Sequence, residues 1–125
     1  MSYILIVDDD TTMAQALSDM VGLFDWETQI VHGPRPALNA IQAKQPALIL
    51  LDLNMPELDG FEFLEEFVNL PEAKRMNKVI VILTSSDYEK DRERAKQYNV
   101  VSGYVTKPLT HEKLVSIMET CFRER

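Results

Sequence analysis

The sequence predicts an α/β fold of three layers, in which helices cover both faces of a parallel sheet. Short apolar runs rich in β-branched residues alternate about five times with longer segments of helical spacing. Such alternation is typical of parallel strands joined by right-handed helical crossovers. Three of the apolar runs are continuous, and continuous runs suit strands that are covered on both faces.

Five segments are expected to form the strands. The first, third and fourth are the continuously apolar runs, whereas the second has polar flanks and suits an edge of the sheet. In chain order, the predicted strands are Tyr3–Val7, Thr28–Val31, Ala47–Leu51, Val79–Leu83 and Gly103–Thr106.

Each of these runs is followed by a segment whose apolar residues have the spacing of a helix. Pro36 is expected to open the second helix at a first-turn position, and Leu38 and Ile41 face inward. In the fifth, Thr110 is the expected N-cap. The apolar stripes of the other helices are Met13, Leu17, Met20, Val21 and Phe24 in the first, Phe61, Leu64, Phe67 and Val68 in the third, and Leu114, Met118, Cys121 and Phe122 in the fifth. The fourth helix is expected over Asp87–Tyr98.

Length and composition indicate one globular domain over residues 1–125. The chain has 20 acidic and 13 basic residues, a formal charge of −7, which argues against a nucleic-acid-coating module. A single cysteine forms no intrachain disulfide. No apolar run approaches the roughly 20 residues of a membrane span, and the start MSYILIVDDD is unlike a signal peptide. We therefore expect a cytoplasmic protein that binds neither nucleic acid nor membrane directly.

Polar residues gather where the predicted strands end. In open parallel sheets, ligands bind beyond the carboxyl ends of the strands. The residues that follow the strands are Asp8, Asp9 and Asp10 after the first, Asp52 and Asn54 after the third, Thr84 after the fourth and Lys107 after the fifth. The sequence therefore predicts that these side chains share one edge of the sheet.

These residue types suit a site that binds Mg²⁺ and phosphate. Crowded carboxylates repel one another unless a cation joins them. Hard oxygen ligands without a cluster of histidine or cysteine favour Mg²⁺ over zinc. Lys107 supplies a point charge for one phosphoryl oxygen, and Thr84 supplies a hydroxyl donor for another. A carboxylate in such a site can itself act as a nucleophile and form an acyl phosphate.

Four motifs carry a resemblance to a known family. They are IVDDD at the first strand, LLDLNMPELDG around the third, ILTSS at the fourth and GYVTKPL at the fifth. With these motifs in this order, the whole chain resembles the receiver domain of two-component response regulators, of the single-domain chemotaxis type. The resemblance implies a doubly wound, flavodoxin-like (βα)5 sheet with strand order 2-1-3-4-5. It also implies a signalling module that catalyses only its own phosphorylation and dephosphorylation and is otherwise no enzyme.

The resemblance implies a role for each acidic residue. Asp52 would accept a phosphoryl group from a sensor histidine kinase or a histidine phosphotransfer protein. Asp8, Asp9, Asp52 and Asn54 would hold Mg²⁺, with Asp9 as a direct ligand, Asp8 acting through water and Asn54 giving its backbone carbonyl.

The resemblance also implies a switch. Thr84 and Lys107 would bind the phosphoryl group, and Tyr104 would turn inward as Thr84 shifts toward it. The Lys107–Pro108 bond would be cis, a form that X–Pro bonds adopt at small cost. The output would be an unknown partner protein or an output domain missing from this chain, and Met1 together with the basic tail favours a stand-alone regulator.

Two alternatives share the α/β architecture. In a haloacid-dehalogenase-like phosphohydrolase, the letters DDDTT would form the nucleophile motif, with Asp8 attacking and Asp10 as acid and base. Against this, Asp52 comes too early, and nothing acidic follows Lys107 until Glu112, inside a helix. A nucleotide- or flavin-binding module would need a glycine- or hydroxyl-rich phosphate loop after the first strand, where three aspartates would repel phosphate.

Several polar residues near the motifs are predicted to be structural. Asp10 is the expected N-cap of the first helix. Asp59 and Gly60 are expected to form a turn that leads into the third helix. His32 and His111 are isolated in the sequence and are predicted to be surface residues without a role as ligands.

Overall fold

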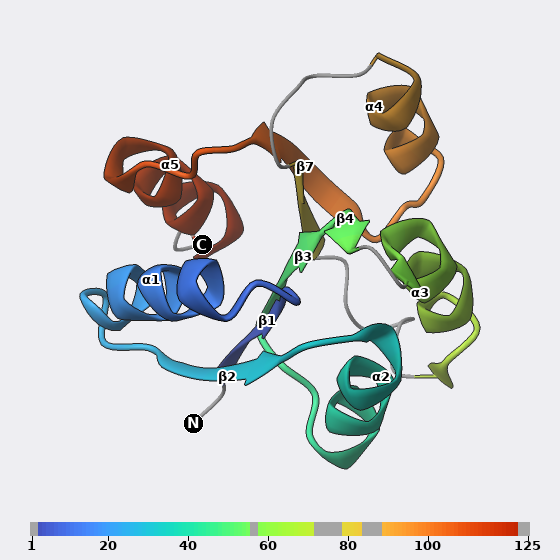
Figure 1. Cartoon of the computed structure of the whole chain (residues 1–125), viewed down its shortest axis with the longest axis horizontal. Helices are drawn as coiled ribbons and strands as arrows, with labels where there is room; N and C mark the ends of the chain where they lie inside the picture. Colours follow the sequence, from blue (N-terminus) through green and yellow to red (C-terminus); the bar gives the residue numbers. More distant parts are fainter. Residues whose placement is uncertain (1–2, 56–57, 72–78, 84–88, 123–125) are drawn as a thin grey trace.

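A parallel sheet of five strands forms the centre of the protein (Figure 1). The computed structural model describes residues 3–55, 58–71, 79–83 and 89–122. The strands of the sheet are β1 (Tyr3–Val7), β2 (Glu27–Val31), β3 (Leu48–Asp52), β6 (Val79–Leu83) and β7 (Val101–Thr106). They lie in the order β2-β1-β3-β6-β7, with every neighbouring pair parallel. This confirms the predicted order 2-1-3-4-5.

The helices lie in two layers, one on each face of the sheet. In the described part of the chain they are α1 (Thr11–Gly22), α2 (Pro34–Ala43), α3 (Gly60–Phe67), α4 (Glu89–Lys96) and α5 (His111–Phe122). Helices α1 and α5 cover one face, and α2, α3 and α4 lie on the other (Figure 1). The three-layer α/β class is thereby confirmed. No described helix is both long and apolar enough to span a bilayer.

The two central strands β1 and β3 contribute to a separate core on each face. Ile4 and Ile6 pack with the α1 and α5 layer, whereas Leu5 and Val7 pack with the opposite layer. Successive side chains of a strand point to opposite faces, so a strand between two layers needs apolar residues at every position. This explains the continuous apolar runs of the sequence.

Strand β2 is an edge strand, as its polar flanks predicted. In register with β1, it pairs from Glu27 opposite Tyr3 to Val31 opposite Val7. Its residues alternate between exposed and partly covered, and only Val31 is buried. The strand begins one residue before the predicted Thr28.

Three other strand boundaries differ from the prediction. Strand β3 begins at Leu48 rather than Ala47 and includes Asp52. Strand β7 begins at Val101 rather than Gly103, and its register against β6 skips Ser102. The serine and the glycine interrupt the apolar pattern at that irregularity, which hid the start of the strand. A short antiparallel pair, β4 (Asn54–Met55) with β5 (Leu58–Asp59), was not predicted.

Helix α2 begins two residues before the predicted position. Pro34 rather than Pro36 is its first residue, and Gly33 is its N-cap. Both prolines stand in the first turn, where the missing N–H is not needed, so either could start a helix. Leu38 and Ile41 face inward as predicted. Helix α4 ends at Lys96, before the predicted Tyr98, and its predicted start at Asp87 lies outside the described residues.

Two residues assigned to apolar stripes are exposed at the helix ends. Met13 is 39% exposed and lies in the first turn of α1. Val68 is 36% exposed because α3 ends at Phe67. Phe63, which the predicted stripe omits, is fully buried and stacks on Phe67 with 5.8 Å between ring centroids.

Candidate functional site

Three carboxylates meet at the carboxyl ends of β1 and β3. These strands are neighbours in register, so Asp8, directly after β1, lies beside Asp52, the last residue of β3. Each is only 3% exposed, whereas Asp9 is exposed. Carboxylate oxygens of all three lie within 4.8 Å of one another. The structure thus brings together three of the four aspartates that the sequence placed at one edge.

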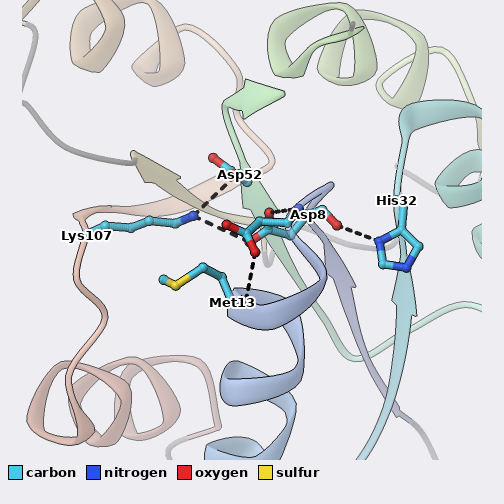
Figure 2. A network of polar contacts seen from close by, with 6 residues as sticks. Asp8, Met13, His32, Asp52 and Lys107 are labelled. Atoms are coloured by element: carbon cyan, nitrogen blue, oxygen red, sulfur yellow. Dashed lines mark hydrogen bonds and ion pairs between the residues drawn. The ribbon is translucent and has the colours of Figure 1, made fainter. Parts of the chain in front are cut away.

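Lys107 reaches this cluster from the end of β7 (Figure 2). Its Nζ lies 3.2 Å from Oδ2 of Asp52 and 3.4 Å from Oδ2 of Asp8. The Lys107 side chain is only 10% exposed, so these ion pairs are poorly screened by water. The Lys107–Pro108 bond is cis, as expected.

The pKa of Asp8 reflects its burial beside a second carboxylate. Burial is the main reason why this pKa rises from 3.8 to about 6, and the hydrogen bond and charge of Asp52 add to the effect. The backbone N–H of Asp10, which donates to Asp8 Oδ1 at 2.9 Å, and the charge of Lys107 act in the opposite direction. A hard divalent cation would suit this group of three neighbouring carboxylates.

The loop from β1 to α1 is fixed on both sides of Asp8. Asp10 is the N-cap of α1, as predicted, and its Oδ1 accepts the Met13 N–H at 3.1 Å. The Asp8 N–H donates to the Val31 carbonyl at 3.1 Å. These bonds tie the acidic loop to the start of α1 and to the end of β2.

His32 was missed as a neighbour of the site. It is exposed, as predicted, but its Nδ1 lies 2.9 Å from the carbonyl oxygen of Asp8 (Figure 2). The signal was its position directly after β2, at the same edge of the sheet. Polar residues were predicted to meet only at the ends of the other four strands of the sheet.

The segment after Asp52 packs against the start of α3. Gly60 begins this helix, and Asp59 pairs with Asn54 rather than forming the predicted turn. A Cβ atom on Gly60 would lie 2.7 Å from Cδ2 and 3.0 Å from Cα of Leu53. Only glycine fits this approach without a shift of the residue next to Asp52.

The other predicted site residues are Thr84, Asn54 and Tyr104. Thr84 lies outside the described residues. Asn54 lies in β4, two residues beyond Asp52. Tyr104 lies in β7 with its hydroxyl oxygen buried, and the Arg92 guanidinium of α4 lies 4.5 Å from the centre of its ring.

A family model decides between the receiver interpretation and the alternatives. The model for the response regulator receiver domain matches residues 4–119. The chain belongs to this family. A receiver domain is a module of two-component signalling rather than an enzyme. The phosphohydrolase and the nucleotide- or flavin-binding module are therefore set aside.

Curated relatives of this receiver domain include longer regulators. The chain is 32% identical to a probable transcriptional regulator, ycf29, of Porphyra purpurea, over 95% of this chain and 56% of the relative. It is 27% identical to the response regulator MprA of Mycolicibacterium vanbaalenii, over 96% of this chain and 50% of the relative. The chain thus spans about half the length of these two proteins. An uncharacterized 14.6 kDa protein of Leptolyngbya boryana is 28% identical and is covered over 86% of its length.

Solved structures agree with the fold of the receiver domain. A two-component response regulator from Cytophaga hutchinsonii is 27% identical, with a TM-score of 0.82 over 99% of this chain and 98% of that one. The chemotaxis protein CheY4 of Vibrio cholerae has a TM-score of 0.86 over 98% of this chain and 99% of that one. At 23% identity, the second likeness concerns the fold alone.

Proposed function

We propose that this receiver domain accepts a phosphoryl group on Asp52 from a phosphohistidine of a sensor histidine kinase or a histidine phosphotransfer protein. The observation that carries the proposal is the buried Asp52 carboxylate, which contacts Lys107 and lies beside Asp8 and Asp9. In the transfer, an Asp52 oxygen bonds to phosphorus as the phosphorus–nitrogen bond breaks. The imidazole nitrogen keeps the electron pair of that bond and takes up a proton from solvent.

Mg²⁺ is the proposed cofactor. The donor set fits, because three carboxylates lie within 4.8 Å of one another and the pKa of Asp8 is raised in their midst. Asp8, Asp9, Asp52 and the backbone carbonyl of Asn54 would hold the ion. When bound, it would offset the negative charge of the phosphoryl oxygens.

Lys107 is the proposed link between phosphorylation and conformation. Its ammonium pairs with Asp52 and Asp8 before transfer, and the new group offers it oxygens that carry nearly two negative charges. We propose that Thr84 provides a second contact and that Tyr104 responds as the switch aromatic. The altered surface would act on an unknown output partner or output domain.

Loss of the phosphoryl group would reset the switch. Water attacks phosphorus, the bond between phosphorus and the Asp52 oxygen breaks, and inorganic phosphate leaves with the Asp52 carboxylate restored. Under this proposal, residues 1–125 form one receiver domain, and the only reactions that it catalyses are its own phosphorylation and dephosphorylation.

Intact mass after incubation with acetyl phosphate tests this function. We expect a mass increase of one phosphoryl group on the wild type with Mg²⁺, and none with EDTA or on Asp52→Asn. Asp10→Asn is the matched control, because asparagine still caps α1 and the change removes the same charge beside the site. This variant should still be labelled.

Two results would overturn the proposal. If the wild type gains no mass with Mg²⁺, Asp52 is no phosphoacceptor under these conditions and the module signals by binding alone. If the adduct survives Asp52→Asn but vanishes in Asp8→Asn, the nucleophile is Asp8.

A further inference from the structure

Lys113 spans the backbone that carries Lys107. It lies in the first turn of α5, and its Nζ donates to the carbonyl oxygen of Thr106 at 2.9 Å and to that of Pro108 at 3.2 Å. These two carbonyls flank Lys107 on either side in the chain. One ammonium group therefore holds both neighbours of the residue that pairs with Asp52.

A lysine at this position needs a compensating interaction. The N-terminus of a helix carries a partial positive charge, so a cation in the first turn is unfavourable there. Hydrogen bonds from a charged donor are about twice as strong as those between neutral groups. Because Lys113 directs its charge back to two loop carbonyls, its own helix start and the loop are joined.

The loop is packed only in part on its α1 side. Leu109 packs against the core formed with α1, but a cavity of about 80 Å³ is lined by Met13 of α1 and by Pro108 and Leu109 of the loop. Close packing normally fixes a backbone segment, and a cavity removes such contacts. The bonds of Lys113 therefore restrict a segment that packing leaves partly unsupported.

We propose that Lys113 is a positioning residue, which holds the loop so that the Lys107 ammonium stays between Asp8 and Asp52. The inference rests on the proposed function, because phosphoryl acceptance is the reaction that would benefit. Lys113 is exposed on the surface and itself touches neither carboxylate. Its effect would be carried entirely by the backbone on either side of Lys107.

The first test compares rates of phosphorylation by acetyl phosphate with Mg²⁺. Lys113→Met removes the donors and should slow the reaction about tenfold, because small misplacements of a charge-stabilising group are costly. Lys113→Arg keeps a charged donor and should recover most of the rate. Lys44→Met is the matched control: it removes the same charge at the exposed end of α2, near Tyr3, and should leave the rate unchanged.

High salt distinguishes positioning by Lys113 from simple attraction between its charge and the anionic acetyl phosphate. Attraction between exposed charges is largely screened at about 0.5 M salt, so the slowing should persist there if Lys113 acts by positioning. The proposal would be overturned if Lys113→Met reacted at the wild-type rate, or if its difference from the wild type vanished at high salt. It would also be overturned if Lys44→Met were slowed equally or if Lys113→Arg did not recover the rate.

The second test needs no phosphorylation. The side-chain ammonium resonance of Lys107, assigned with Lys107→Arg, should shift or broaden in Lys113→Met and stay in place in Lys44→Met. An unchanged resonance in Lys113→Met would overturn the positioning role. If the wild type takes up no phosphoryl group, the proposed function fails, while this resonance still decides the role of Lys113.

Discussion

Asp8 lies where two requirements conflict. As a buried carboxylate beside Asp52, it is costly to ionise, and this cost appears as a pKa raised to about 6. As a candidate metal ligand, it has to be ionised near neutral pH. When ionised, the residue therefore lowers the stability of the metal-free fold, and a bound cation would offset this cost.

The first prediction is that Asp8→Asn stabilises the metal-free protein at pH 7.5 by about 1–2 kcal/mol. A carboxyl group whose folded pKa is raised binds its proton more tightly in the folded state. Its contribution to stability is thus fully present below about pH 4 and is lost as the pH rises through about 6. At about 1.4 kcal/mol per pKa unit, ionised Asp8 costs roughly 3 kcal/mol of stability. The variant recovers only part of this, because Lys107 loses one of its two carboxylate partners.

Urea unfolding in EDTA at several pH values measures this effect. The advantage of Asp8→Asn over the wild type should shrink steadily between pH 7 and pH 4. A variant less stable than the wild type at pH 7.5, or an advantage that grows toward low pH, would contradict the assignment of burial as the cause.

At the scale of elements, the start of α3 packs closely against the residue that follows β3. Gly60 begins α3 against Leu53, the residue that follows Asp52. A movement of this helix start is therefore transmitted directly to the end of β3.

We predict that Gly60→Ala destabilises the protein by about 1–3 kcal/mol, the usual cost of an extra methyl group in a filled space. The added Cβ would lie 3.0 Å from the Leu53 Cα, a backbone atom that cannot rotate away. Alanine has a higher helix propensity than glycine by about 1 kcal/mol, and this gain offsets only part of the packing cost.

Gly22→Ala is the matched control for this prediction. Gly22 ends α1, and a Cβ there would have no neighbour within 4 Å. This change should leave stability unchanged or raise it by up to about 1 kcal/mol. Equal effects of the two substitutions on the urea midpoint would show that packing against Leu53 is not the cause.

The elements also explain which features were predictable from sequence. Parallel strands end at one edge of the sheet, so Asp8, Asp52 and Lys107 could be brought together without knowledge of any distance. The start of α2 could not be chosen between Pro34 and Pro36, because both fit a first turn.

Contacts that depend on side-chain direction could not be predicted from the sequence. The position of His32 after β2 places it at the edge of the site, but its contact with the Asp8 carbonyl could not be predicted, nor could the return of Lys113 to the Thr106 carbonyl. Neither belongs to a motif, and each contact requires the finished loop. The unpredicted burial of Phe63 is of the same kind, since it depends on how α3 is rotated against the sheet.

At the scale of the whole molecule, the excess of seven negative charges and the acidic site both favour divalent cations. A cation that binds only the folded state raises stability by mass action, by about 2.7 kcal/mol at one hundred times its Kd. General screening of surface repulsion also stabilises an acidic protein, so the two effects need to be separated.

We predict that Mg²⁺ raises the thermal midpoint of the wild type well beyond NaCl of equal ionic strength. Asp8→Asn should lose this extra rise. Asp25→Asn is the control, because Asp25 is exposed with a φ of 65°, a conformation that asparagine tolerates. An extra rise that is the same in all three proteins would mean that Mg²⁺ acts on the surface charge and not at the aspartate cluster.

The ion pairs of Lys107 have a consequence for the order in which the protein is made. They join residues separated by 99 and 55 positions, from almost one end of the chain to the other. A nascent chain on the ribosome carries both acidic partners long before the lysine emerges. Under the proposed function, such a chain lacks the Lys107 ammonium group that completes the acceptor site. Competence to receive a signal would then require that the chain has been made as far as Lys107 and that β7 has joined the sheet, so shorter chains would not draw phosphoryl groups away from the kinase.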